Sequence, residues 1–157
     1  MIVIADTTPL NYLILIGEGE VLAQLYGRVI IPTAVRDELT NRLTPAVVRN
    51  WIANAPSWLE TQAAVMIATD FPPGLGAGER EAISLAQALR ADQLIADDMS
   101  ARREAARRGI AVIGTLGVLR EAAFEGLIDL ASTLDRLRET SFHIAPGLIE
   151  YLLKSPR

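Results

Sequence analysis

Five short runs, mostly apolar except for the one at 58–62, are spaced along the chain, and a segment with helical features comes after each of them. The runs predict strands at residues 2–5, 29–31, 58–62, 93–96 and 110–113. The first run, Ile2–Ala5, contains no polar residue, which is typical of a strand that a parallel sheet buries on both faces. Strands this short, in alternation with helices, predict an α/β sandwich with a mainly parallel sheet and right-handed crossovers.

Helix patterns fill most of the chain between and after the strands. They predict helices at residues 9–16, 19–25, 32–41, 44–54, 79–89, 100–108, 116–124 and 129–139, and a last one from about residue 146. The segment 70–78 (DFPPGLGAG) is irregular and predicts a loop. Because the 157 residues contain no repeat and no long linker, we expect one domain, 1–157, with a C-terminal helical extension from about residue 129.

Residue usage excludes several classes of catalytic chemistry. The chain has no cysteine, one histidine (His143) and one lysine (Lys154), so thiol nucleophiles, Cys/His metal sites, P-loops and Schiff-base lysines are excluded. Carboxylates, hydroxyls and arginines remain for catalysis. The net charge of −4 argues against a broadly basic surface for nucleic acid.

Hydropathy and the first residues give an expectation about location. No uninterrupted apolar run reaches the roughly 18 residues needed to span a bilayer, and the apolar start lacks the basic region of a signal peptide. We therefore expect a cytoplasmic protein with no membrane association.

Acidic residues follow two of the predicted strands directly. Asp6 comes after the strand 2–5, and Asp97 and Asp98 come after the strand 93–96. The usable crevice of a parallel sheet lies beyond the carboxyl ends of its strands, so these acids can face one crevice. Glu38 and Glu79, on predicted helices, could join them. Carboxylates that converge repel one another unless a cation lies among them, and oxygen ligands select Mg²⁺ or Mn²⁺.

Each of these acids also has a purely structural interpretation. Asp6 could cap the helix that follows it, and Asp97 or Asp98 could cap the helix that starts near residue 100. Glu79 lies in a first helical turn, where the helix dipole favours an acid without any metal. Glu38 could be a solvated helix residue.

Four segments together carry a resemblance to a known family. They are IVIADTTPLNYLILIG, VIIPTAVRDEL, GLGAGEREAISLAQAL and LIADDMSARREAARRGIAVIGTLGVL, in this order. They resemble the PIN-domain superfamily, and within it the small prokaryotic proteins related to toxin ribonucleases of the VapC type. The resemblance implies a three-layer sandwich with strand order 3-2-1-4-5. It also implies a site in which acidic residues bind Mg²⁺ or Mn²⁺ and hydrolyse RNA phosphodiesters.

The resemblance assigns the acids one by one. It places the first on Asp6 in DTT, the second on Glu38 in VRDEL, the third on Glu79 in AGEREA and the fourth on Asp97 in ADD. Glutamate stands in the third position where aspartate is commoner. Because Asp98 is adjacent to Asp97, the fourth metal ligand is ambiguous by one residue. Glu81 could also take the place of Glu79.

Other residues near the acids are candidates for contact with substrate. Thr7 could hold a ligand or a water beside Asp6. Arg102, Arg103 and Arg107 follow the acidic turn and could contact RNA phosphates. Alternatively they form a solvated face with Glu104 and Asp98 as ion-pair partners.

The leading hypothesis is therefore a hydrolase, an endoribonuclease that depends on Mg²⁺ or Mn²⁺, as the toxin of a toxin–antitoxin pair. Its partners would be RNA, an antitoxin protein and a second copy in a homodimer. Exposed apolar surface for an antitoxin could come from the helices at 9–16 and 44–54. The alternative is a catalytically weak PIN-like regulator that binds nucleic acid or protein.

Overall fold

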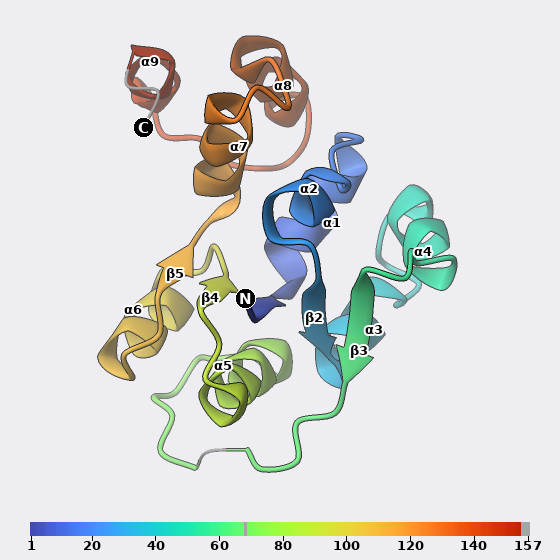
Figure 1. Ribbon diagram of the computed structural model, residues 1–157, viewed down its shortest axis with the longest axis vertical. Coiled ribbons are helices and arrows are strands. Elements are labelled where there is room, and N and C mark those ends of the chain that lie inside the picture. Colours follow the sequence, from blue (N-terminus) through green and yellow to red (C-terminus); the bar gives the residue numbers. More distant parts are fainter. Residues whose placement is uncertain (68, 155–157) are drawn as a thin grey trace.

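A parallel sheet with helices on both faces forms the body of the molecule (Figure 1). The computed structural model describes residues 1–67 and 69–154. The strands in these ranges are β1 (Val3–Ala5), β2 (Val29–Pro32), β3 (Leu59–Gln62), β4 (Gln93–Ile95) and β5 (Val112–Ile113). The helices are α1 (Thr7–Leu15), α2 (Val21–Tyr26), α3 (Thr33–Leu39), α4 (Ala46–Ala53), α5 (Ala77–Leu89), α6 (Met99–Arg107), α7 (Thr115–Phe124), α8 (Leu130–Arg138) and α9 (Leu148–Lys154).

The strand order is β3-β2-β1-β4-β5, and every neighbouring pair is parallel. The wholly apolar strand β1 lies in the centre, where Ile4 pairs with Ile30 of β2 on one side and with Leu94 of β4 on the other. The predicted fold class and the predicted strand order are both confirmed.

Alternate residues of the strands face two separate apolar layers. Val3 and Ala5 belong to the larger core with α1, α2, α4, α7 and α8, whereas Ile4 and Leu94 belong to the smaller one with α5 and α6. In Figure 1, α5 and α6 lie below the strands, and α7, α8 and α9 lie above them. This period-two alternation follows from the geometry of a strand and explains why every residue of β1 is buried.

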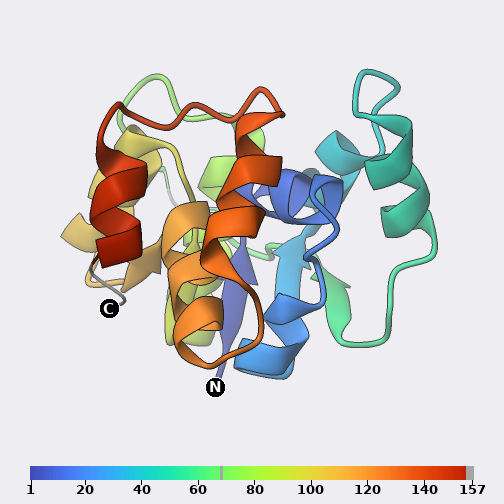
Figure 2. The same ribbon diagram turned by 90° about the horizontal axis from the view of Figure 1, so that it is seen from above.

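The helices after the sheet pack on the same large core. Leu134 and Leu137 of α8 and Leu152 of α9 are buried in it together with Val3. Figure 2 shows α8 and α9 side by side with α7 over the sheet. Residues 129–154 thus belong to the layer on one face of the sheet.

Several predicted boundaries move by a few residues. The last strand is shorter than predicted because the Ile110 amide donates to the Ala105 carbonyl at the end of α6 instead of joining the sheet. Thr44 does not cap α4; Pro45 is the N-cap residue, and the Thr44 hydroxyl donates to the Glu38 carbonyl at 2.8 Å. Every helix in the described ranges is too short or too polar to cross a membrane.

Candidate functional site

The ends of β1 and β4 lie next to each other at the carboxyl edge of the sheet. Ala5 pairs with Ile95, and the Asp6 amide donates to the Ile95 carbonyl at 2.9 Å. The chain therefore leaves both strands at the same point. The short connections that follow carry Asp6 on one side and Asp97 and Asp98 on the other.

A pocket of about 210 Å³ opens at this edge, and we call it the acidic pocket. Residues from four parts of the sequence meet there. They are Asp6, Thr7, Thr8, Glu38, Gly76, Glu79 and Asp98. The structure thus brings together four of the five predicted acids and Thr7, and Asp97 lies just outside the pocket lining.

Asp6 is the buried member of the set, with 4% of its surface exposed. Its carboxylate caps α1 and accepts from the Thr7 amide at 2.8 Å. The pKa of Asp6 is raised from 3.8 to about 7, mainly by burial and also by the nearby charges of Glu79, Glu38 and Asp97, against the lowering effect of the Thr7 amide. Asp6 therefore does both things that the sequence predicts: it caps the helix that follows it, and it belongs to the cluster of acids.

Glu38 reaches the pocket from the last turn of α3. Its carboxylate accepts from the Gly78 amide at 3.1 Å and from the Thr7 hydroxyl. A Cβ on Gly78 would lie 2.6 Å from Glu38 Oε1, so the carboxylate rests in the space that this glycine leaves open. The position of Glu38 thus depends on a residue 40 positions away.

Glu79 stands in the first turn of α5, where its Oε1 accepts from the Gly76 amide at 3.0 Å. Its Oε2 is buried and has no hydrogen-bond donor among the described residues. Burial raises the pKa of Glu79, and the nearby carboxylates of Asp98 and Glu38 raise it further against the lowering effect of the Gly76 amide. Glu81 lies outside the pocket lining and accepts weakly from the Ala34 amide at 3.3 Å.

The two adjacent aspartates have separate roles. Asp97 accepts from the Thr115 amide at 2.8 Å and from the Thr115 hydroxyl at 2.5 Å, which ties β4 to the start of α7. Asp98 caps α6 by accepting from the Ala101 amide at 2.9 Å, and it lines the acidic pocket. Asp98 therefore lines the acidic pocket and Asp97 does not, and the fourth position of the family pattern still fits either residue.

The three predicted arginines are spread over different surroundings. Arg102 lines a second pocket beside Asp97. Arg103 is exposed and lines neither of these pockets. Arg107 binds Glu104 at 2.5 Å and lies 3.9 Å from Asp70, so the predicted ion pair with Glu104 is present.

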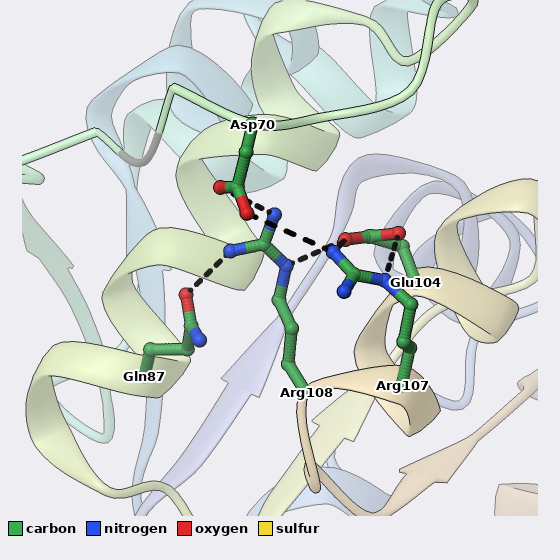
Figure 3. A network of polar contacts seen from close by, with 5 residues as sticks. All are labelled: Asp70, Gln87, Glu104, Arg107 and Arg108. Atoms are coloured by element: carbon green, nitrogen blue, oxygen red, sulfur yellow. Dashed lines mark hydrogen bonds and ion pairs between the residues drawn. The ribbon is translucent and has the colours of Figure 1, made fainter.

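A wider polar network, of which only the pair of Arg107 with Glu104 was predicted from the sequence, holds the loop before α5 against α6 (Figure 3). We call it the loop clasp; its members are Asp70, Gln87, Glu104, Arg107 and Arg108. Arg108 contacts Glu104 at 2.7 Å and Asp70 at 3.1 Å, and its guanidinium stacks 4.3 Å from the centre of the Phe71 ring. Glu104 lies three and four residues before Arg107 and Arg108, a spacing that brings side chains together on a helix, and this spacing is the sequence signal for the two ion pairs.

The donor set of the acidic pocket has the chemistry that a divalent cation requires. Its acids are hard oxygen ligands, and a buried Glu79 oxygen without a donor beside a second carboxylate calls for a proton or a cation between them. In the described ranges, however, no three acids stand in a geometry that would hold a metal ion, because each acid is turned toward a protein donor. The pocket therefore fits a divalent cation by its chemistry, and cation binding would require these side chains to turn.

A parallel sheet in this order, with an acidic pocket at its carboxyl edge, places the protein among the α/β proteins with a carboxylate site. More particularly, the chain belongs to the PIN-domain family, since the profile of the PIN-domain family DUF3368 matches residues 2–156. Members of the PIN superfamily are generally nucleases, and PIN domains generally use divalent metal ions.

Comparison with solved structures finds a similar chain. It is a PilT N-terminus domain protein from the hyperthermophilic archaeon Sulfolobus solfataricus, 22% identical, with a TM-score of 0.48 over 92% of this chain and 100% of that one. No curated protein matches the sequence.

Proposed function

We propose that this PIN domain is a metal-dependent endoribonuclease. The observation that carries the proposal is the convergence of Asp6, Glu38, Glu79 and Asp98 on one pocket. A buried aspartate whose pKa is raised to about 7 costs stability, and such perturbed acids cluster at functional sites. Membership of a superfamily of nucleases supports the same proposal.

The acids of the pocket would divide the work. Asp6, Glu38, Glu79 and Asp98, or Asp97 in its place, would hold one or two Mg²⁺ or Mn²⁺ ions. A bound ion lowers the pKa of its water and neutralises the charge that develops on the phosphate.

Proton transfer would fall to the same side chains. Glu79 Oε2 is a buried acceptor without a donor, so it is placed to take a proton from the attacking water. The sole histidine, His143, lines the neighbouring pocket and not this one, so a carboxylate is the available base. Thr7 would orient Glu38 through the hydrogen bond of its hydroxyl.

The test is hydrolysis of RNA by the purified protein with Mn²⁺ or Mg²⁺. We expect cleavage that chelation by EDTA abolishes and that Asp6→Ala and Glu79→Gln lower by at least about 10²-fold. Glu81→Gln is the matched control, because Glu81 stands two residues away on the same helix outside the pocket. Equal cleavage by the Asp6 variant and the unchanged protein would refute the proposal.

A second function is favoured by one observation. Every acid of the pocket is hydrogen-bonded to protein, and no three described acids form a metal site. Such a pocket, in which the acids already have hydrogen-bond donors from the protein, is what we would expect of a catalytically weak PIN-like regulator that binds RNA or protein. RNA binding without cleavage, over many RNAs with Mn²⁺, would favour it.

A toxin role would require an antitoxin. The apolar side chains of α1 face the core, with Leu10, Leu13 and Ile14 buried, so this predicted partner surface is wrong. Exposed apolar side chains occur instead at Leu43, just before α4, and at Val47 in its first turn. We propose a protein partner or a second copy on that surface; co-purification from the native host and the mass in solution test the two.

A further inference from the structure

A second pocket, of about 300 Å³, lies beside the acidic pocket at the same edge of the sheet. The two share the Asp97–Asp98 turn, since Asp97 lines the second pocket and Asp98 the first. We call the second one the arginine pocket, after Arg102. A molecule that spans both would pass directly over this turn.

The arginine pocket holds a cation that the protein itself does not neutralise. Within the described ranges, no ion pair or hydrogen bond engages the guanidinium of Arg102. Gly114 leaves room for it, since a Cβ there would lie 2.5 Å from Arg102 Nη1. The one acid of the pocket, Asp97, is already held by Thr115 through both of its oxygens. Arg102 is therefore free to bind an anion.

Most of the remaining lining of the pocket is aromatic or apolar. Phe142 and His143, from the segment between α8 and α9, line it together with Leu116 and Leu148. Phe142 is half-buried and packs edge-to-face on Tyr12, with ring centres 5.0 Å apart, whereas His143 is exposed. A flat aromatic ligand could stack here, as bases do on side chains that bind single strands.

We infer that the arginine pocket binds one nucleotide of the RNA next to the bond that the acidic pocket cleaves. Arg102 takes its phosphate, and His143 and Phe142 take its base. A cation and an aromatic wall in one cavity match a nucleotide, and the volume lies at the lower end of small-molecule sites. This inference rests on the proposed function for the identity of the substrate.

The first experiment uses the single histidine as a probe. Since His143 is the only histidine, its imidazole proton signals in NMR report on this pocket alone. We expect adenosine 5′-monophosphate to shift them in a saturable way and ribose 5-phosphate or inorganic phosphate to shift them far less. Arg102→Gln should abolish the saturable shift.

The second experiment measures binding of a short single-stranded RNA to the full chain carrying Asp6→Asn, which prevents cleavage during the titration. Arg102→Gln should weaken binding about tenfold and make the salt dependence shallower by about 0.7, the slope of one phosphate contact. His143→Ala should weaken binding about fivefold or more through lost stacking. The control is Arg28→Gln, which removes the same charge at the amino end of β2, where Arg28 pairs with Glu60 at 3.3 Å.

The outcomes separate this inference from the proposed function. If the protein cleaves RNA but Arg102→Gln and His143→Ala bind it like Arg28→Gln, the inference is overturned and the ribonuclease proposal stands. If the protein cleaves nothing but the nucleotide still shifts the His143 signals through Arg102, the pocket is supported and the cleavage proposal fails. Equal shifts by phosphate alone would overturn the base contact.

Discussion

At the scale of single residues, the acidic pocket is held in place by contacts that cost stability. Asp6 is buried beside other acids, and its pKa of about 7 means that the folded chain holds a proton that a free aspartate would release. Glu38 occupies space above Gly78 that any other residue would fill. The buried carboxyl group of Asp6 and a glycine inside α5 both cost stability, and a pocket that serves chemistry would account for both.

The raised pKa of Asp6 predicts a pH dependence of stability in metal-free buffer. Between about pH 4 and pH 7 the folded chain keeps the Asp6 proton and the unfolded chain loses it, so the free energy of unfolding falls as pH rises through this window. Asp6→Asn keeps the cap acceptor and removes the charge. We expect the variant to gain stability at pH 8, on the order of 2 to 4 kcal/mol, and almost none at pH 4. Urea unfolding with EDTA at both pH values measures it, and parallel pH profiles of the two proteins would contradict it.

The close approach at Gly78 predicts a variant that folds but loses activity. In Gly78→Ala, the new methyl group would displace the Glu38 carboxylate, which is the mobile end of its side chain. Alanine also favours the helix in which Gly78 lies. We therefore expect an unchanged or slightly higher Tm and RNA cleavage lowered about tenfold or more. Gly74→Ala is the comparison variant: Gly74 lies in the loop before α5 and has open space around it, although its positive φ strains an alanine. A drop in cleavage from Gly74→Ala alone would locate the sensitivity in the loop and not at Glu38.

At the scale of elements, the loop clasp determines how the long loop enters α5. The side chains of Glu104 and Arg108 are only 6% and 7% exposed, so this ion pair lies under the loop that Asp70 and Phe71 belong to. The same loop ends at Gly76, whose amide binds Glu79. The clasp thus fixes one end of the segment whose other end enters the acidic pocket.

The clasp predicts unequal effects of two neighbouring arginines on stability. Arg108→Gln removes the buried partner of Glu104 and releases Asp70, so we expect Tm to fall by several degrees. Arg107→Gln should lower Tm less, because the Arg107 side chain is 59% exposed. Thermal unfolding of both variants measures the difference, and equal losses would contradict a buried clasp.

The acid sensitivity of the protein should change with the clasp. The hydrogen bond from Arg107, together with Arg108, lowers the pKa of Glu104 to about 2, so its contribution to stability is present above about pH 4.5 and is lost as pH falls toward 2. We expect Arg108→Gln to lose less stability over this range than the unchanged protein. Circular dichroism during acid titration measures it; an identical acid transition in both proteins would refute the assignment.

At the scale of the whole molecule, the carboxyl edge of the sheet brings together residues that are distant along the chain. Only the folded chain assembles the acidic pocket, so a cation that binds there stabilises the folded state by mass action. We expect millimolar Mn²⁺ to raise Tm of the unchanged protein and to leave Tm of Asp6→Ala unaffected. Ca²⁺ and Na⁺ at equal ionic strength are the controls for charge screening. A Tm that Mn²⁺ and Mg²⁺ leave unchanged would favour the binding function over hydrolysis.

The sequence by itself determined the layers of this protein and the edge at which its acids meet. Strand β1 could be predicted because a short, wholly apolar, β-branched run is typical of a strand buried on both faces of a parallel sheet, and Asp6 could be placed because it follows that strand. Helix ends could not be predicted to the residue, because a proline such as Pro45 fits more than one position at a helix start.

Only the tertiary structure decided which contacts the acids make. The sequence could not distinguish Asp97 from Asp98, since both follow β4; the approach of Thr115 assigned Asp97 to α7 and left Asp98 at the pocket. The clasp and the arginine pocket arise likewise from residues that are distant along the chain, such as Asp70 with Arg108 and Arg102 with His143. Periodicity reports the face that a residue presents to its neighbours in sequence, whereas these contacts depend on where the sheet brings separate segments together.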